Sequence, residues 1–273
     1  MLNLIRADLK RVVKDKLFLI CSIIALAFAI INPLLYEVLF SMAGANEQQL
    51  AMLGVLPTAK SLFFQSFLPG NNFGLIMPIL LGIVLCKDFS YGTIRNKLIA
   101  GHSRAKVFLS MLITCIITMC GIMLVQGIVT LGISLIFYEY STVAFSLAEL
   151  GYVLISLLFE ILIYITISAI LCFLCVFMKN SGVCAVVYIA IAFLLSIIGG
   201  VFLITTSLVS PEKKALIDLL DFLAKSNIFS TTIVGAGTSY SLKEVLYILI
   251  PNIVSSALLI TFGILVFNKK DLK

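Results

Sequence analysis

Residues 86–106 read CKDFSYGTIRNKLIAGHSRAK and form the longest basic connector between two apolar segments of the chain. The connector holds five Lys or Arg side chains, and its single acid is Asp88. An amphipathic run follows the Gly-Thr pair at 92–93 and places three apolar side chains on one helical face, namely Ile94, Leu98 and Ile99. Because each charge in hydrocarbon costs on the order of 3 kcal/mol, this connector is expected at the cytoplasmic surface of a membrane.

The composition of the chain is that of a polytopic membrane protein. Its 273 residues are 62% hydrophobic and 12% charged, and the mean hydropathy is +1.19. The net charge of +6 does not indicate nucleic-acid binding, because the basic residues stand at the ends of apolar runs. The seven cysteines lie in or beside apolar segments and are interpreted as small buried hydrophobic residues. That interpretation includes the CxxC spacing of Cys172 and Cys175.

Six apolar runs can each cross about 30 Å of hydrocarbon as a helix. We expect these spans at about 17–40, 66–86, 107–138, 150–178, 183–209 and 245–267. The fold class is therefore all-α, and residues 17–267 form one six-helix transmembrane domain. The second span is predicted to start near residue 66, because the apolar run at 73–86 is short for a span by itself. Residues 41–66 are predicted to form an outer loop with a short surface helix.

Residues 1–16 are predicted to form an amphipathic helix that lies on the inner leaflet. The apolar face of this helix is expected to consist of Leu2, Ile5, Leu9, Val12 and Val13. An ordinary charged flank before the first span is the alternative. The connector at 87–106 is assigned to the cytoplasm.

Residues 210–244 are interpreted as an extracellular loop that contains an amphipathic helix. Ser210, Pro211 and Glu212 are predicted to open this helix as a cap, a first-turn proline and a first-turn acid. The helix is expected to run to about Lys225.

The distribution of charge predicts the orientation in the membrane. Most Lys and Arg residues fall in the N-terminal segment, the connector at 87–106 and the C-terminal tail, whereas most acids fall in the other loops. This bias places both termini in the cytoplasm of a multi-pass plasma-membrane protein.

The chain carries no motif of an enzyme. It has no Gly-Lys dipeptide, hence no phosphate-binding Walker A loop, and its one histidine is His102. We expect no cofactor or metal in this chain and no nucleic-acid partner. Glu160 is the one acid predicted at depth in the membrane. It is interpreted either as part of a translocation pathway or as a carboxyl that is protonated or bonded to a neighbouring helix.

The connector resembles the signature of ABC-2 type permeases. Asp88 stands four residues before Gly92-Thr93, and Ser103-Arg104 precedes the third span. The order of elements is similar as well, with a basic interfacial helix, six spans and a tight inner turn between spans four and five. Two positions depart from the family pattern: Asp88 replaces the usual Glu, and Met111 stands where many members carry Lys. The second departure removes a positive charge from the inner end of span three.

The resemblance implies the ABC-2 (type V) exporter fold, with a coupling helix that docks in a cleft of a cytoplasmic ATPase. It assigns coupling to Asp88, Tyr91, Gly92, Thr93, Ile94, Arg95, Lys97 and Leu98, and a second, smaller contact to Lys179 and Asn180. Gly92 would allow a sharp break and Thr93 would cap the helix. Ile94 and Leu98 would fill the apolar cleft, while Arg95 and Lys97 would pair with acids. The implied partners are two ATPase chains that bind ATP and Mg²⁺, a second copy of the permease, and membrane lipid.

The function expected from this resemblance is export of hydrophobic or amphipathic cargo, with amphipathic peptides such as toxins or lantibiotics preferred. Export of drugs, antibiotics or lipids by the same kind of permease is the alternative. A secondary transporter and a sensor or scaffold protein are the other classes left open. Energy for transport would come from the ATPase subunit, because this chain has no nucleotide-binding motif of its own.

Overall fold

The computed structural model describes residues 1–43, 58–70, 72–141, 145–178, 180–210, 212–229 and 239–270. Every regular element in these ranges is a helix, as the all-α prediction requires. In chain order the helices are α1 (Leu2–Lys14), α2 (Lys16–Ala43), α4 (Ala59–Gln65), α5 (Asn72–Ser90), α6 (Thr93–Ile99), α7 (Arg104–Phe137), α8 (Leu147–Met178), α9 (Ser181–Leu208), α10 (Lys214–Ser226) and α11 (Leu242–Lys269).

Five helices, α2, α7, α8, α9 and α11, are long and apolar enough to cross a membrane. Helices α5 and α6 meet the same criterion only as a pair, which is bent by 58° at the break between them. A helix rises 1.5 Å per residue, so the 28 residues of α9 reach about 42 Å, more than the hydrocarbon core requires. By length and composition the chain is therefore a multi-pass membrane protein, and its described residues supply five candidate spans, or six if the bent pair is one span.

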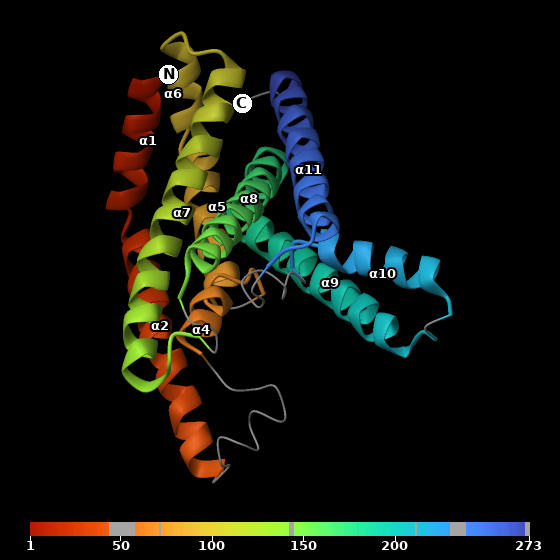
Figure 1. Ribbon diagram of the computed structural model, residues 1–273. Helices are drawn as coiled ribbons and strands as arrows, with labels where there is room; N and C mark the ends of the chain where they lie inside the picture. The colour runs from red at the N-terminus through yellow and green to blue at the C-terminus, as the bar shows by residue number, and fades with distance from the viewer. Residues whose placement is uncertain are drawn as a thin grey trace.

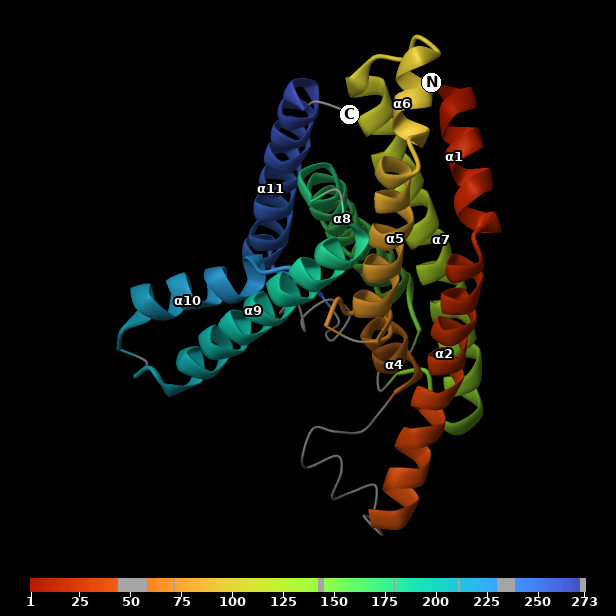
Figure 2. The ribbon, with the colours of Figure 1, turned by 180° about the vertical axis from the view of Figure 1, so that it is seen from behind.

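Helix α8 occupies the centre of the bundle (Figure 1). It packs against α5 and α7 on one side and against α9 and α11 on the other. Helix α2 covers α5 and α7, and α10 lies across α9 and α11 (Figure 2). The start of α1 and the end of α11 lie at the end of the bundle that carries α6 (Figure 1). The cytoplasmic orientation of the termini stays a prediction.

Helix α4 is a separate element wedged between spans. Phe64 and Phe67 are buried, and the Tyr164 hydroxyl donates a hydrogen bond of 2.7 Å to the Phe67 carbonyl. Gly127 lies so close to the Phe67 ring that a Cβ there would be 2.3 Å from Cζ. Two predictions are therefore wrong: the helix in this region is not a surface helix, and the helix that carries the apolar run at 73–86 begins at Asn72 instead of near residue 66. Phe64 lies in α4 and Phe67 in the turn that follows it, and both are buried against the spans.

An ion pair joins α4 to the start of α8. The Lys60 ammonium lies 2.6 Å from a carboxylate oxygen of Glu149, and both side chains are almost fully buried. The same ammonium stands 4.6 Å from the centre of the Tyr152 ring, a cation–π contact. This pair fixes α4 at its first turn, where the sequence predicted an outer loop with a short surface helix.

Helix α10 is amphipathic, as predicted, but it starts later than predicted. Its first residue is Lys214 and its N-cap is Lys213, which makes no side-chain capping bond. Pro211 lies outside the described residues. The Lys213 N–H donates to the Ser210 carbonyl, so Ser210 belongs to a turn that precedes the helix and is not its cap. Lys225 then ties α10 to α11 through Glu244 at 3.2 Å.

The apolar face predicted for α1 is split between the interior of the bundle and its outer surface. Val12 is buried against the bundle together with Leu4 and Asp8, whereas Leu2 and Val13 stay exposed. The four apolar residues left outside line an open surface along the helix: Leu2, Ile5, Leu9 and Val13. The placement of Val12 on that outer face is therefore wrong. Its side chain is one turn from Asp8, and both are turned inward toward α7.

Candidate functional site

The α5–α6 elbow is a bend in the backbone at Tyr91 and Gly92. Gly92 has a φ of +69° and is the N-cap of α6, which confirms the predicted break. A left-handed backbone favours glycine, because a side chain there costs about 1–2 kcal/mol. Thr93 is the first residue of the helix and makes no capping bond, so the prediction that Thr93 is the cap is wrong. A side-chain cap comes from a residue with an extended backbone just before the helix, whereas Thr93 is already the first helical residue.

The far end of α6 is closed by a second left-handed glycine. Gly101 has a φ of +88°, and its N–H donates to the Leu98 carbonyl at 3.0 Å. The His102 N–H donates to the Lys97 carbonyl at 3.2 Å, which completes a Schellman motif. The Ser103 hydroxyl then accepts from the Lys106 N–H and caps α7. Helix α6 is thus bounded on both sides by defined turns.

An ion network attaches the elbow to α1 and α7; its members are Asp8, Arg11, Asp88, Lys97 and Ser110. The Lys97 ammonium and the Ser110 hydroxyl each donate to Asp8, both at 2.7 Å. Arg11 pairs with Asp88, which also lies 3.9 Å from Lys97. The two carboxylates are buried, and their charges are matched by two cations.

Burial affects the cations of this network. It lowers the pKa of the Lys97 ammonium, an effect that the hydrogen bond to Asp8 opposes. It also lowers the pKa of Arg11, against the attraction of Asp8 and Asp15. These two cations stay charged in a buried position because the carboxylates that pair with them are in direct contact. The network therefore holds α6 against α1 by interactions that fail if one partner is removed.

A second set of contacts connects the elbow to α11. One guanidinium nitrogen of Arg104 donates to three carbonyls at the end of α11: Phe267 at 2.9 Å, Asn268 at 2.8 Å and Lys270 at 2.6 Å. Carbonyls in the last turn of a helix lack the usual intrahelical donor, although the Phe267 carbonyl also accepts from the Lys270 N–H at 3.4 Å, and a cation there suits the helix dipole. The ring of Phe89 packs edge-on to that of Phe267, with centroids 6.0 Å apart. The sequence singled out Ser103-Arg104 without indicating this capping role.

The predicted coupling residues are not all on the surface. Tyr91 and Arg95 are exposed; Gly92, Thr93, Lys97 and Leu98 are half-buried; Asp88 and Ile94 are buried. Ile94 is only 1% exposed and belongs to the core of this chain, so it is not available to fill a cleft in a partner. The apolar side chains that α6 and its first turn leave outside are Tyr91, 77% exposed, and Ile99, 75% exposed. Together with the exposed Arg95, which lies between them in the sequence, they make up what we call the outer face of the elbow.

Asn180 and Lys179 were predicted to make a second contact. Asn180 is exposed and caps α9, because its side-chain oxygen accepts from the Gly182 N–H at 2.9 Å. Lys179 lies outside the described residues. The contact itself stays a prediction.

Glu160 is fully buried on α8, and neither of its carboxylate oxygens has a hydrogen-bond partner in the described part of the chain. A cavity of about 360 Å³ does lie between α8, α9, α10 and α11. It is mostly apolar, with a few polar side chains such as Thr166, Asn227 and Ser255. Glu160 is not among its lining residues, so the assignment of Glu160 to a translocation pathway stays a prediction.

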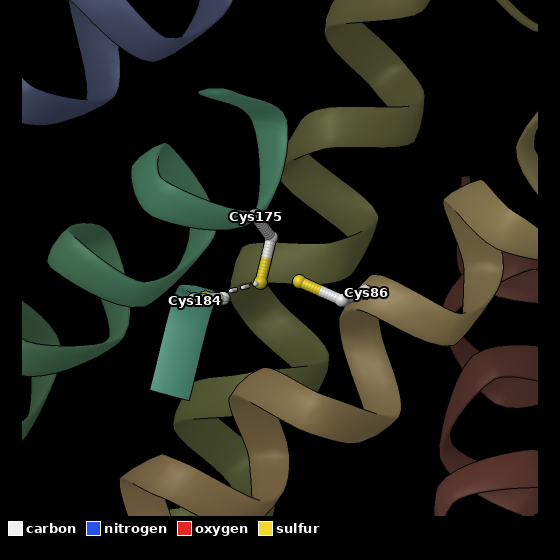
Figure 3. A group of neighbouring side chains, drawn as sticks. All are labelled: Cys86, Cys175 and Cys184. Atoms are coloured by element: carbon white, nitrogen blue, oxygen red, sulfur yellow. Dashed lines mark hydrogen bonds between the residues drawn. The ribbon is translucent and has the colours of Figure 1, made fainter. Parts of the chain in front are cut away.

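Three cysteines meet where α5, α8 and α9 come together. The sulfur atoms of Cys86, Cys175 and Cys184 all lie within 4.8 Å of one another, and all three side chains are buried (Figure 3). The CxxC spacing did not indicate this group, since Cys172 is not part of it. Sequence reasoning missed the cluster because its members are far apart in the chain and come from three helices.

No family model matches the chain, and no curated protein matches its sequence. The class of the protein therefore follows from its own helices, which make it an all-α, multi-pass membrane protein.

Proposed function

We propose that this chain is the membrane-spanning subunit of an ATP-driven exporter of the ABC-2 type. It has no motor of its own and is moved by a separate ATPase subunit that binds ATP and Mg²⁺. The observation that carries the proposal is the elbow: a short helix, bounded by two left-handed glycines, that is tied to α1 through Lys97 and packs against α5 and α7. A force applied to such a helix is transmitted to the spans instead of being absorbed by a flexible loop.

The contacts of the elbow support this transmission. The ion network joins α6 to α1 and α7, and Arg104 joins the start of α7 to the end of α11. Helices α7 and α11 both pack against α8, the central span. Displacement of α6 would therefore reach α8 through two routes.

The outer face of the elbow is the proposed ATPase contact. Tyr91 and Ile99 are two large apolar side chains exposed on either side of the Arg95 cation. An acidic rim around an apolar cleft on the ATPase would complement this face. Asp88, Ile94 and Lys97 act from inside, by keeping α6 in place, and Gly92 sets its angle. Asn180, at the turn before α9, would make the smaller second contact.

The rest of the proposed assembly follows the same reasoning. Two copies of this chain would bind two ATPase chains, with both termini in the cytoplasm and the elbow at the inner face of the plasma membrane. The apolar cavity between α8 and α11 favours a hydrophobic or amphipathic cargo, such as an amphipathic peptide, a drug or a lipid. A secondary transporter is the second candidate, and the observation that favours it is Glu160, which is buried and has no hydrogen-bond partner among the residues that the structure describes.

Co-purification tests the proposal. The tagged full-length chain is extracted from its native membranes in mild detergent, and ATPase activity and bound proteins are measured. We expect an ATP-binding chain with a Walker A loop, and we expect Arg95→Glu to weaken its binding at least about tenfold, or about 1.4 kcal/mol. Lys213→Glu, which reverses an exposed cation on the turn before α10, is the matched control and should bind normally.

Two results would refute the proposal. One is repeated recovery of a folded chain alone, with no ATPase bound. The other is transport by the purified chain that follows an ion gradient and is unaffected by ATP, which would support the secondary transporter instead.

A further inference from the structure

The cysteine cluster of Cys86, Cys175 and Cys184 has the geometry of a metal site. Cys175 and Cys184 have their sulfurs 3.7 Å apart, and all three sulfurs fit within 4.8 Å. Three sulfurs that share one metal at about 2.3 Å are themselves about 3.8–4.0 Å apart. The cluster therefore reaches this arrangement with side-chain shifts of under about 1 Å.

The three side chains converge from three separate helices. In Figure 3 the sulfurs of Cys86 and Cys175 are turned toward one another, and Cys184 is linked to Cys175. Cys86 lies near the end of α5, Cys175 three residues before the last residue of α8, and Cys184 in the first turn of α9. Convergence of this kind is unnecessary if the cysteines only fill space, since alanine or valine would pack in a core as well.

The surroundings restrict the ion that would fit. Soft thiolate ligands select Cu(I) and Zn(II) among the common metals. Structural Zn(II) sites are almost always four-coordinate, and the ligand group found in the described residues offers three ligands. Within the described residues, the other hydrogen-bond partner of these thiols is the Gly82 carbonyl, which accepts from Cys175 at 3.4 Å. A carbonyl is a poor ligand for a soft ion, so a three-coordinate thiolate site for Cu(I) is favoured.

A positive charge stands near the cluster. The Lys270 ammonium donates to the carbonyl of Phe177, two residues after Cys175, at 3.4 Å. Three thiolates with one Cu(I) carry a net negative charge, which a neighbouring ammonium stabilises in a medium of low dielectric. Cys184 also lies about one helical turn from Asn180 and Ser181, which cap and begin α9, so an ion need cross little apolar protein to reach the cluster.

We propose that Cys86, Cys175 and Cys184 form a three-coordinate, thiophilic metal site that binds one Cu(I) ion. Bound metal would connect α5 to α8 and α9 close to the elbow, and it would restrict the movement of these three helices relative to one another. This inference concerns metal binding alone and holds or fails independently of the proposed transport function.

The test is metal binding by the full-length chain in detergent, with a phosphine reductant present. One equivalent of Cu(I) is added, and a coloured Cu(I) chelator competes for it. We expect one chelator-resistant Cu(I) per chain, with X-ray absorption showing three sulfur ligands at about 2.3 Å. Replacing Cys86, Cys175 or Cys184 by Ser should weaken Cu(I) binding by at least about tenfold. Loss of a residue that only supports a metal ligand already weakens metal binding about 10–100-fold, and loss of a ligand should cost no less.

Two matched chains make the result decisive. Cys120→Ser, outside the cluster, should bind as the unmodified chain does. A chain in which Cys21, Cys115, Cys120 and Cys172 are all Ser keeps only the cluster, and it should still bind one Cu(I). This second chain reports binding even if a cluster variant fails to fold.

Three outcomes would overturn the proposal. The first is Cu(I) fully removed by the chelator from a folded chain. The second is equal weakening by Cys120→Ser, which would mean scattered binding to thiols. The third is a thiol count on freshly extracted chain that shows Cys175 and Cys184 joined as a disulfide under reducing conditions.

Discussion

The brace between α1 and the elbow depends on Asp8, and its removal gives the sharpest prediction. Asp8 accepts two hydrogen bonds at 2.7 Å, from Lys97 and from Ser110, and it is buried. In Asp8→Ala both donors lose their partner, and Lys97 keeps only Asp88 at 3.9 Å. Breaking a buried pair costs about 3–5 kcal/mol, and the partial exposure of Lys97 reduces this. We expect a loss of about 2–4 kcal/mol.

A double-mutant cycle separates the pair from its surroundings. The free energy of unfolding in mixed micelles is measured for Asp8→Ala, Lys97→Met and the double variant. The coupling energy should be about 1.5–3 kcal/mol, because one charge-assisted hydrogen bond links the two side chains. Lys10→Ala, an exposed position on the same helix, is the control and should change stability by less than about 0.5 kcal/mol. Additive effects of Asp8→Ala and Lys97→Met would refute the reasoning.

Four further predictions concern single positions. Gly92→Ala should destabilise the chain by about 1–2 kcal/mol in the same unfolding assay, because residue 92 has a φ of +69°. A steric clash would not contribute, since a Cβ there would meet no atom within 4 Å. No loss of stability would mean that the backbone at residue 92 can change its φ. Arg104→Ala should speed amide exchange of the last turn of α11, whose carbonyls lose their donor, while exchange of α9 stays unchanged. Partial burial by itself raises the pKa of the Asp15 carboxyl, but the hydrogen bonds from the Leu17 N–H and from Lys87 lower it by more. The net effect is a lowered pKa, so the folded state favours the ionised carboxylate. Its contribution is present above the usual pKa of about 4 and is lost as pH falls through the lower folded value. Asp15→Asn should flatten that acid limb of a stability profile by a small amount, because the side chain is only half-buried and water screens its interactions. Glu160→Gln should be neutral or stabilising by up to about 1–3 kcal/mol, because the buried carboxyl has no partner in the described residues; marked destabilisation would point to a bound cation or proton network there.

The spans were predictable because each rests on a local property, the length of an apolar run. The third span was expected at 107–138, and α7 covers Arg104–Phe137. The break at Gly92 was predictable for a similar reason, since its residue type limits the backbone. The second span failed because the apolar residues at 64–67 satisfied the same local criterion while belonging to a different helix and the turn that follows it. Run length alone does not show where a chain turns.

The site was less predictable, because its residues meet partners far along the chain. Asp8 pairs with Lys97, 89 positions away, and with Ser110, 102 positions away. A helical projection of residues 1–16 does not show that Asp8 is buried, and a projection of residues 93–99 leaves Ile94 free to contact a partner. Only the packing of α1 and α6 against α7 shows that both side chains point inward. The cysteine cluster was missed for the same reason.

The position of α4 has a consequence for biosynthesis. Phe67 receives its hydrogen bond from Tyr164, which is translated 97 residues later. At about 5–20 residues per second, this part of the chain waits on the order of 5 to 20 s for the helix that completes its pocket. Throughout that interval the aromatic side chains of α4 need lipid or the insertion machinery as temporary surroundings. A ribosome stalled before residue 164 should therefore hold a nascent chain in which Phe64 and Phe67 are still open to chemical labelling.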